Sequence, residues 1–216
     1  MANINQFKSR LQGGVRPNLY EVQINFPNTS LFNLTAGTTP DNGDLVRASK
    51  FLCRSAALPG HSQGLIEVPF RGRFLKIPGD RTFEAWTATF YNTMDFDLRA
   101  AFEQWINFGN KVDENLGTMN FGGSSQFDSY FQDIFVRQKS KDVAYAATGT
   151  DGDVNATLRT YKLVGAWPTS VGAINLAYDS NDAIEEFDVE FQYQYLDAGQ
   201  DDGVGELAGT SRRVVV

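Results

Sequence analysis

Few residues in this chain have the chemistry that an enzyme or a metal site needs. His61 is the only histidine and Cys53 is the only cysteine. One residue of each kind cannot complete a usual zinc site, and no nucleophile has an evident base beside it. We therefore expect no catalytic residues, no bound metal and no cofactor. His61 is expected to be a loop residue, and Cys53 a small apolar residue of a strand.

Three short patterns begin like ligand-binding loops but depart from them at decisive positions. The run from Asp151 starts as a calcium loop does, but Ala156 and Lys162 stand where that loop needs glycine and glutamate. Residues 203–205 lack the third glycine of a dinucleotide-binding turn, and residues 122–126 lack the closing glycine of a nucleophile elbow. The carboxylates could include an acid–base pair for glycoside hydrolysis, but a solvated acidic surface is the simpler interpretation.

Charge is distributed unevenly along the 216 residues, whose net charge is −7. Residues 1–80 contain nine bases and five acids, whereas residues 81–216 contain ten bases and twenty-one acids. Between Leu163 and Ser211 there are ten carboxylates and no lysine or arginine. Because affinity for nucleic acid comes mostly from basic side chains, a phosphate-gripping role is disfavoured. The opposite charges of the two parts predict attraction within one subunit or between neighbours.

The acidic stretch contains the clearest strand pattern. Between Phe187 and Tyr195, apolar residues occupy the odd positions and polar residues the even ones. This period of two predicts a strand with one buried and one wet face. The wet face carries Asp188, Glu190, Gln192 and Gln194. Residues 19–26 show the same pattern, and their polar side carries Glu21, Gln23 and Asn25.

Basic and apolar residues are interleaved over residues 65–77. The interleaved residues include Phe70, Arg71, Arg73, Phe74 and Lys76. Since Pro69 and Pro78 cannot donate to a central ladder, the segment is expected to be an extended arm or hairpin. Such a surface could stack nucleic-acid bases. In so acidic a chain, contact with a neighbouring protein is the favoured interpretation.

The other elements also predict a mainly β fold. Further strands are expected at 50–57, 82–91, 133–139 and 158–164, and loops at 27–47 and 110–130. One helix is expected at 95–108, capped by Thr93 or Asp95 and ended by Gly109. Its buried stripe would contain Leu98, Ala101, Phe102 and Trp105. The predicted fold is an antiparallel β-sandwich or barrel with one flanking α-helix and an extended β-hairpin arm. No signal peptide or membrane span is expected.

Several motifs, in the same order over residues 15–196, resemble those of the tail tube proteins of contractile-tailed bacteriophages (myoviruses). They are Arg16-Pro17-Asn18-Leu19-Tyr20, Ala57-Leu58-Pro59-Gly60, Pro78-Gly79-Asp80-Arg81-Thr82-Phe83-Glu84-Ala85-Trp86, Phe135-Val136-Arg137-Gln138, Gly165-Ala166-Trp167-Pro168-Thr169-Ser170-Val171-Gly172 and Tyr178-Asp179-Ser180-Asn181. The resemblance implies a tail tube domain at 1–196, with insertions near 28–47, 112–130 and 143–157. Residues 197–216 would form a C-terminal extension.

The resemblance also implies a function and a set of partners. It implies a β-barrel-like subunit that forms homohexameric rings, which stack into a hollow tube inside a contractile sheath. The implied partners are further copies of the chain, the tail sheath protein, and the baseplate and tail-terminator proteins, with no membrane. DNA would pass through the lumen without specific binding. The protein would belong to the virion tail, after assembly in the host cytoplasm.

Residues can be matched to these roles as expectations. Asp188, Glu190, Gln192 and Gln194 are the leading candidates for the lumen wall, and Glu21 and Gln23 come second; outer solvent is the alternative for both. Phe70, Arg71, Arg73, Phe74 and Lys76 are the candidates for contact between subunits. A baseplate-associated tube initiator of the same fold and a carbohydrate-binding β-sandwich module are the alternative functions, and a hydrolase is disfavoured because there is only one histidine.

Overall fold

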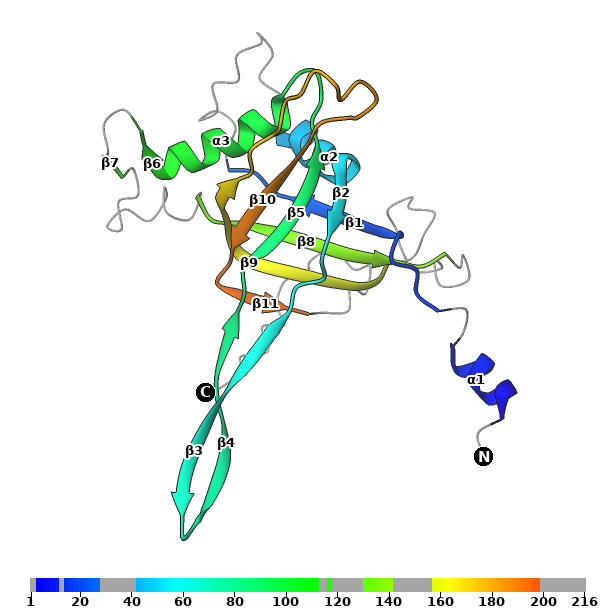
Figure 1. Cartoon of the computed structure of the whole chain (residues 1–216), viewed down its shortest axis with the longest axis vertical. Coiled ribbons are helices and arrows are strands. Elements are labelled where there is room, and N and C mark those ends of the chain that lie inside the picture. Colours follow the sequence, from blue (N-terminus) through cyan, green and yellow to red (C-terminus); the bar gives the residue numbers. More distant parts are fainter. Residues whose placement is uncertain are drawn as a thin grey trace, which may run out of the picture. The chain divides into compact units, whose positions relative to one another are not determined.

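The structure is a computed structural model that describes residues 3–11, 14–27, 42–112, 116–117, 130–141 and 157–198 (Figure 1). The chain divides into two compact units. The larger comprises Glu21–Val136 and Tyr161–Ala198, and the smaller comprises Met1–Tyr20, Arg137–Thr160 and Gly199–Val216. Most of the predicted insertions and of the C-terminal extension lies outside the described residues, as do residues 122–126 and 203–205. No helix in the described ranges is long and apolar enough to cross a membrane.

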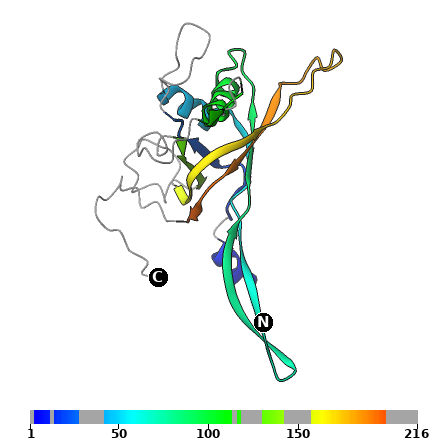
Figure 2. The ribbon, with the colours of Figure 1, turned by 90° about the vertical axis from the view of Figure 1, so that its left-hand side faces the viewer.

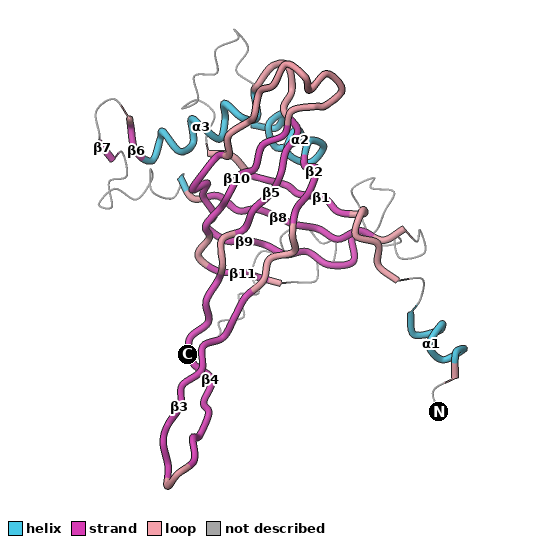
Figure 3. The backbone as a smooth tube through the Cα atoms, viewed as in Figure 1, coloured by secondary structure: helices cyan, strands magenta, loops and turns pink. Residues whose placement is uncertain are grey.

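Strands dominate the described residues (Figure 3). The strands are β1 (Tyr20–Ile24), β2 (Cys53–Ala56), β3 (His61–Phe70), β4 (Arg73–Phe83), β5 (Trp86–Tyr91), β6 (Asn110–Lys111), β7 (Leu116–Gly117), β8 (Gln132–Lys139), β9 (Thr157–Val171), β10 (Glu186–Gln192) and β11 (Tyr195–Asp197). The helices are α1 (Ile4–Leu11), α2 (Asn42–Leu52) and α3 (Asp97–Gly109). The mainly β class with an extended hairpin is confirmed.

A seven-stranded sheet in the order β1-β8-β9-β10-β5-β2 forms the body of the fold, and β11 pairs with β9. The pairs β9–β10, β10–β5 and β5–β2 are antiparallel. The long strand β9 pairs with β11 through residues 162–164 and with β10 through residues 167–171. Buried side chains come from both halves of the sheet, among them Ile24, Ile134, Phe90 and Phe187. The sheet therefore encloses an apolar core.

The period-two patterns of the sequence are confirmed on the core side. On β10, Phe187, Val189 and Phe191 are buried, as are Val22 and Ile24 on β1. The expected strand at 82–91 is divided, because β4 ends at Phe83 and β5 begins at Trp86. Residues 84–85 between them separate the hairpin strand from the sheet strand.

Helix α3 supplies the aromatic centre of the core. Its predicted stripe is confirmed, because Leu98, Ala101, Phe102 and Trp105 are all buried. The Phe102 ring lies 5.3–6.4 Å, between centroids, from the rings of four phenylalanines in β10, β5 and the segment after β1. These contacts attach the helix to the core side of the sheet.

The N-terminal end of α3 differs from the expectation, whereas the helix ends at Gly109 as predicted. The N-cap is neither Thr93 nor Asp95 but Phe96, which has a left-handed backbone (φ 54°) and makes no side-chain cap. A turn in which the Phe96 N–H donates to the Thr93 carbonyl, at 3.0 Å, places the helix start further along the chain. Gly109 is the last helical residue, and a Cβ there would lie 2.7 Å from the Tyr130 hydroxyl. Close packing of Tyr130 therefore favours glycine at this helix end.

Helix α2 was not predicted. Residues 42–47 were expected to be loop and residues 50–52 strand, and both expectations are wrong because α2 runs through Leu52. The helix has its own apolar face, on which Leu45 and Ser49 are one turn apart and fully buried. Only β2, four residues long, remains of the expected strand at 50–57. His61, expected in a loop, begins β3, and half-buried Cys53 begins β2 as predicted.

The smaller unit contains α1, a second helix that was not predicted. Every residue of α1 is exposed, and Lys8 and Arg10 lie in its last turn. Elsewhere in this unit the Gln138 amide donates to the carbonyls of Arg16 and Leu19, at 2.9 and 2.6 Å. These bonds hold the segment that precedes β1 beside the end of β8.

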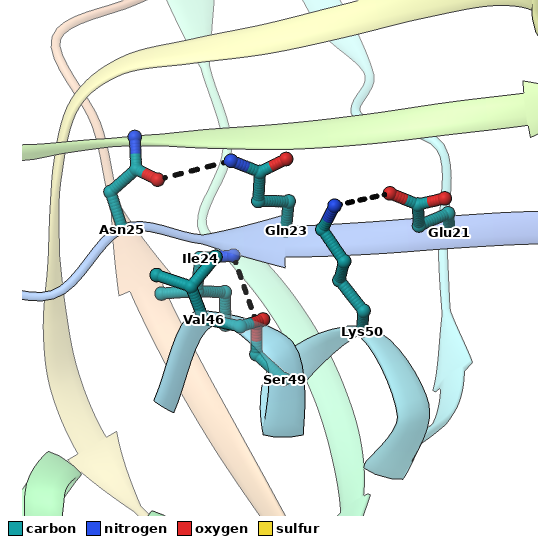
Figure 4. Close-up of polar contacts among 7 residues, drawn as sticks. All are labelled: Glu21, Gln23, Ile24, Asn25, Val46, Ser49 and Lys50. Atoms are coloured by element: carbon teal, nitrogen blue, oxygen red, sulfur yellow. Dashed lines mark hydrogen bonds and ion pairs between the residues drawn. The ribbon is translucent and has the colours of Figure 1, made fainter. Parts of the chain in front are cut away.

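Ser49 connects α2 to strand β1. The buried Ile24 N–H donates to Ser49 Oγ at 3.1 Å, and the Ser49 hydroxyl donates to the Val46 carbonyl at 2.7 Å (Figure 4). Strand β1 lies at one end of the sheet order, and its Ile24 N–H thereby obtains a partner from helix α2. This contact satisfies a polar group that the core would otherwise bury unpaired.

Ser49→Ala is expected to lower the free energy of unfolding by about 1–3 kcal/mol, because it leaves the buried Ile24 N–H without its acceptor. Urea denaturation followed by circular dichroism measures the change. Ser9→Ala on α1 is the matched control, because Ser9 is exposed and its hydroxyl bonds only within its own helix, to Gln6. Equal midpoints for both variants would contradict the assigned role of Ser49.

Candidate functional surfaces

The outward side of β10, β5 and β2 is a polar, acidic surface, here called the acidic face. The register pairs Asp188 with Thr89 and Glu190 with Thr87, which places these four side chains on the side opposite the core. Thr89 Oγ1 donates to Asp188 Oδ1 at 2.7 Å, and Ser55 Oγ donates to Thr89 Oγ1 at 3.0 Å. This row of hydrogen bonds crosses three strands and holds an exposed carboxylate in position.

The four leading candidates do not all belong to this face. Asp188 is exposed, whereas Glu190 and Gln192 are half-buried on the same side of β10. Gln194 lies beyond the end of β10, where its N–H donates to the Val164 carbonyl at 3.0 Å. The structure therefore places Asp188, Glu190 and Gln192 together and puts Gln194 in the bend before β11.

The acidic strand β10 has a basic residue beside it in space, although no basic residue is close to it in the sequence. Arg54 on β2 forms an ion pair with Glu186, the first residue of β10, across 132 positions of the sequence. This pairing compensates charge at one end of the acidic face. Asp188, in contrast, accepts a hydrogen bond from the neutral Thr89 hydroxyl rather than from a base.

The second candidate surface, on β1, carries charge that is already compensated. Lys50 Nζ on α2 lies 3.1 Å from Glu21 Oε1, and the Glu21 side chain is only 16% exposed. Gln23 Nε2 donates to Asn25 Oδ1 at 3.3 Å (Figure 4). The acidic face on β10 therefore remains the stronger source of uncompensated negative charge.

Strands β3 and β4 form a long hairpin that extends away from the sheet (Figures 1 and 2). It pairs from His61 with Phe83 to Phe70 with Arg73, and so exceeds the expected span of 65–77. Arg71 and Gly72 connect the strands, and both have positive φ, 45° and 80°. This is the two-residue turn geometry that fits the twist of paired strands.

One side of the hairpin is an exposed apolar surface, here called the hairpin stripe. Cross-strand pairing places on it Ile66, Val68, Phe70, Leu75 and Ile77, together with Arg73. These five apolar side chains are 40–66% exposed. A contiguous apolar surface of this kind usually marks a site of protein contact.

The predicted contact residues are divided between the two sides of the hairpin. Phe70 and Arg73 lie on the stripe, whereas Phe74 and Lys76 lie on the opposite side and Arg71 occupies the turn. The Arg71 guanidinium lies 5.5 Å from the centre of the Phe70 ring. Basic and apolar groups therefore meet at the tip.

The base of the hairpin is attached to the core. Trp86 Nε1 donates to the Ala57 carbonyl at 2.6 Å, and the Tyr193 hydroxyl donates to the Gly60 carbonyl at 3.4 Å. The Phe83 ring packs on Tyr193, with 5.8 Å between centroids. Burial, and then the nearby charge of Glu84, raises the pKa of Tyr193, so its hydroxyl remains a donor. These contacts fix the point at which the hairpin leaves the sheet.

Sequence comparison identifies the family of this fold. The family model described as "Phage tail tube protein" matches residues 15–197, a span that contains the acidic face and the whole hairpin. The chain belongs to this family. It is 30% identical over 180 residues to tail tube protein gp19 of Enterobacteria phage T4, covering 83% of this chain and 89% of that one. It is 29% identical over 196 residues to the tail tube protein of Serratia phage KSP90, covering 89% and 95%.

Solved structures show the same tail tube fold at lower identity. A chain of the PVC sheath–tube complex, an extracellular contractile injection system, matches with a TM-score of 0.51 and 16% identity, over 93% of this chain and 99% of that chain. A chain of the anti-feeding prophage cap matches with a TM-score of 0.52 and 16% identity, over 87% and 91%. The family assignment therefore rests on sequence, and the fold agrees with it.

Four further contributors to the acidic face were not predicted: Arg54, Ser55, Thr87 and Thr89. Thr87 and Thr89 alternate with the buried residues of β5, so the same period of two could have placed them outward. Arg54 left no comparable signal, because its partner is far away in sequence. Within the described ranges, no group of three or more histidine, cysteine, aspartate or glutamate side chains is arranged to hold a metal ion.

Proposed function

We propose that this tail tube protein forms homohexameric rings that stack into a hollow tube, and that its lumen is acidic and conducts the DNA genome. The observation that carries the proposal is the acidic face, presented by the sheet of a chain that belongs to the tail tube family. The role is structural and requires neither catalysis nor a cofactor. Residues 1–196 are the tube domain, and the protein is part of the virion tail after assembly in the host cytoplasm.

An anionic wall suits the passage of DNA. Duplex DNA is bound mainly through its phosphates by lysine and arginine. On this wall Arg54 is already paired with Glu186, so few such contacts are offered. Asp188 carries uncompensated charge on this wall, and Thr87 and Thr89 add hydroxyls that retain water. Repulsion acts over about 8 Å at physiological ionic strength. The genome would therefore pass through a hydrated layer and meet little resistance.

Ring closure would protect the edges of the sheet. Within the described ranges β2 lies at one end of the sheet order and pairs only with β5. An open strand edge of this kind invites pairing with other chains. In a closed head-to-tail ring every edge meets the next subunit, and no edge remains for aggregation. The same principle extends along the tube, where the hairpin stripe would be covered by a neighbouring subunit.

The partners follow from the tube's place in a contractile tail. The outer wall would contact the tail sheath protein, and the two ends of the tube would contact baseplate and tail-terminator proteins. The solved relatives support this assignment, because one comes from a sheath–tube complex and another from a tube-terminating cap. Because their sequence identity is low, these structures support the fold directly and the partners only by analogy.

Negative-stain electron microscopy of the purified chain tests the proposal. Hollow rings or tubes are the expected result. A persistent monomer that binds glycans would contradict it and would favour a carbohydrate-binding module. Rings that elongate only on an added baseplate would instead indicate a tube initiator of the same fold.

A further inference from the structure

A second exposed apolar surface lies on the connection between β9 and β10, residues 172–185. Leu176 is 80% exposed, Tyr178 is fully exposed and Ile184 is 69% exposed. The connection also encloses a cleft of about 690 Å³, lined largely by small and apolar side chains of the same segment. The Arg99 guanidinium donates to the Gly172 carbonyl at 3.0 Å and holds the start of the connection. Such a surface needs a covering partner.

This connection is also negatively charged. It carries Asp179, Asp182 and Glu185, and no lysine or arginine occurs between Leu163 and Ser211. Asn92 Nδ2 donates to Glu185 Oε2 at 2.9 Å, so this carboxylate has a neutral partner. Asp179 and Asp182 are exposed at the turn of the connection. A partner for this surface should therefore combine apolar side chains with positive charge.

The hairpin of the same chain has these properties. Its stripe is apolar, and residues 65–78 contain three bases and one acid. The acid, Glu67, lies 3.8 Å from Lys76 across the hairpin, which leaves Arg71 and Arg73 as the basic groups of the tip. The hairpin stripe and the β9–β10 connection are thus complementary in both charge and apolar character.

The two surfaces lie at opposite ends of one strand. The hairpin joins β5 at Trp86, whereas the connection enters β10 at Glu186, which pairs with Tyr91 at the other end of β5. Figures 1 and 2 show the hairpin and this connection extending in opposite directions from the sheet. One subunit therefore cannot place its hairpin on its own connection. A second copy, displaced along the direction of β5, can receive it, and the contact then repeats head to tail.

We propose that the hairpin stripe of one copy binds the β9–β10 connection of a second copy in the adjacent ring, with Arg71 and Arg73 facing Asp179 and Asp182. This inference rests on the proposed tube and specifies its inter-ring contact. The connection thereby acts as the receiving surface, and each subunit contributes one hairpin and one receiving surface. Stacking then has a fixed polarity.

Cysteine cross-linking tests the contact directly. In a Cys53→Ser background, the double variant Phe70→Cys/Tyr178→Cys should give a ladder of covalent multimers on a non-reducing gel after tubes are mildly oxidised. A disulfide requires Cα atoms about 4.4–6.8 Å apart, so the ladder reports close contact. Ser62→Cys/Tyr178→Cys is the control, because Ser62 is exposed but lies at the hairpin base. Tubes that give no more ladder than this control would overturn the inference.

Charge exchange provides a second measurement that leaves the apolar side chains of the stripe unchanged. Asp179→Arg/Asp182→Arg should reduce tube yield by at least about tenfold, and combining it with Arg71→Glu/Arg73→Glu should restore most of the yield. If wild-type tubes form and the loop variant polymerises equally well, the inference fails while the proposed function stands. If the wild-type chain forms no rings or tubes, the proposed function fails, and the inference fails with it.

Discussion

Replacing both Arg71 and Arg73 by glutamate is expected to abolish tube formation while leaving a folded monomer. The two residues lie at the exposed tip of the hairpin, on the turn and on the stripe. Bringing like charges together at an interface costs several kcal/mol, and each 1.4 kcal/mol changes an association constant tenfold. The concentration needed for polymerisation should therefore rise by about 100-fold or more.

The monomer should survive this change because the hairpin tip contributes nothing to the core. No residue between positions 61 and 78 is buried. Sedimentation and negative-stain microscopy measure tube yield, and thermal melting by circular dichroism measures the fold. Lys8→Glu/Arg10→Glu on α1 is the matched control, because it makes the same change in net charge at exposed positions. Normal tubes from the hairpin variant would refute the proposed contact role.

Much of the fold could be predicted from local periodicity. The alternation along β10 and β5 reports a strand with one buried side, and the spacing of Leu98, Ala101, Phe102 and Trp105 reports one helical face. The hairpin was predicted because prolines and glycines bracket a segment of alternating residues. Each of these features is encoded within about fifteen neighbouring residues, a window in which the period of a helix or strand can be recognised.

The features that were missed depend on long-range packing. Helix α2 contacts the core through the buried residues Leu45 and Ser49, and this apolar face is too narrow to be recognised in the sequence. Gly43, a poor helix former, weakens the helical pattern further. The pairing of Arg54 with Glu186 joins strands far apart in sequence. The N-cap of α3 depends on a turn that puts Phe96 in a left-handed conformation, which its residue type does not favour.

The charges of the two candidate lumen surfaces could not be compared from the sequence for a similar reason. Alternation reports which side of a strand is wet, but it cannot distinguish two wet surfaces from each other. Glu21 and Asp188 both have the pattern of an outward carboxylate. Only the structure shows that Glu21 is 3.1 Å from Lys50, whereas Asp188 meets a threonine hydroxyl. Tertiary contacts therefore separate a compensated surface from one that retains its charge.

Reversing the charge of the acidic face, with Asp188→Lys and Glu190→Lys, is expected to convert the proposed lumen from a repelling to a binding wall. In a six-membered ring the two substitutions replace roughly a dozen negative charges by positive ones, repeated in every ring. Proteins that contact 6–10 phosphates lose about 10³–10⁵-fold in affinity between 50 and 200 mM salt. Variant tubes assembled with duplex DNA should therefore retain it at 50 mM salt and release most of it at 200 mM.

The location of the bound DNA decides whether this face lines the lumen. DNA held inside a tube is shielded from nuclease, whereas DNA on the outer wall is digested, so the expected result is nuclease-resistant DNA in the variant and none in wild type. Asp188→Asn/Glu190→Gln should retain little DNA, because it removes negative charge without adding bases. Asp44→Lys/Asp95→Lys is the control, because it makes the same net change at exposed positions outside β10. If the lysines of the β10 variant bind only nuclease-sensitive DNA, the acidic face lies on the outside of the tube, and its negative charge cannot serve the passage of the genome.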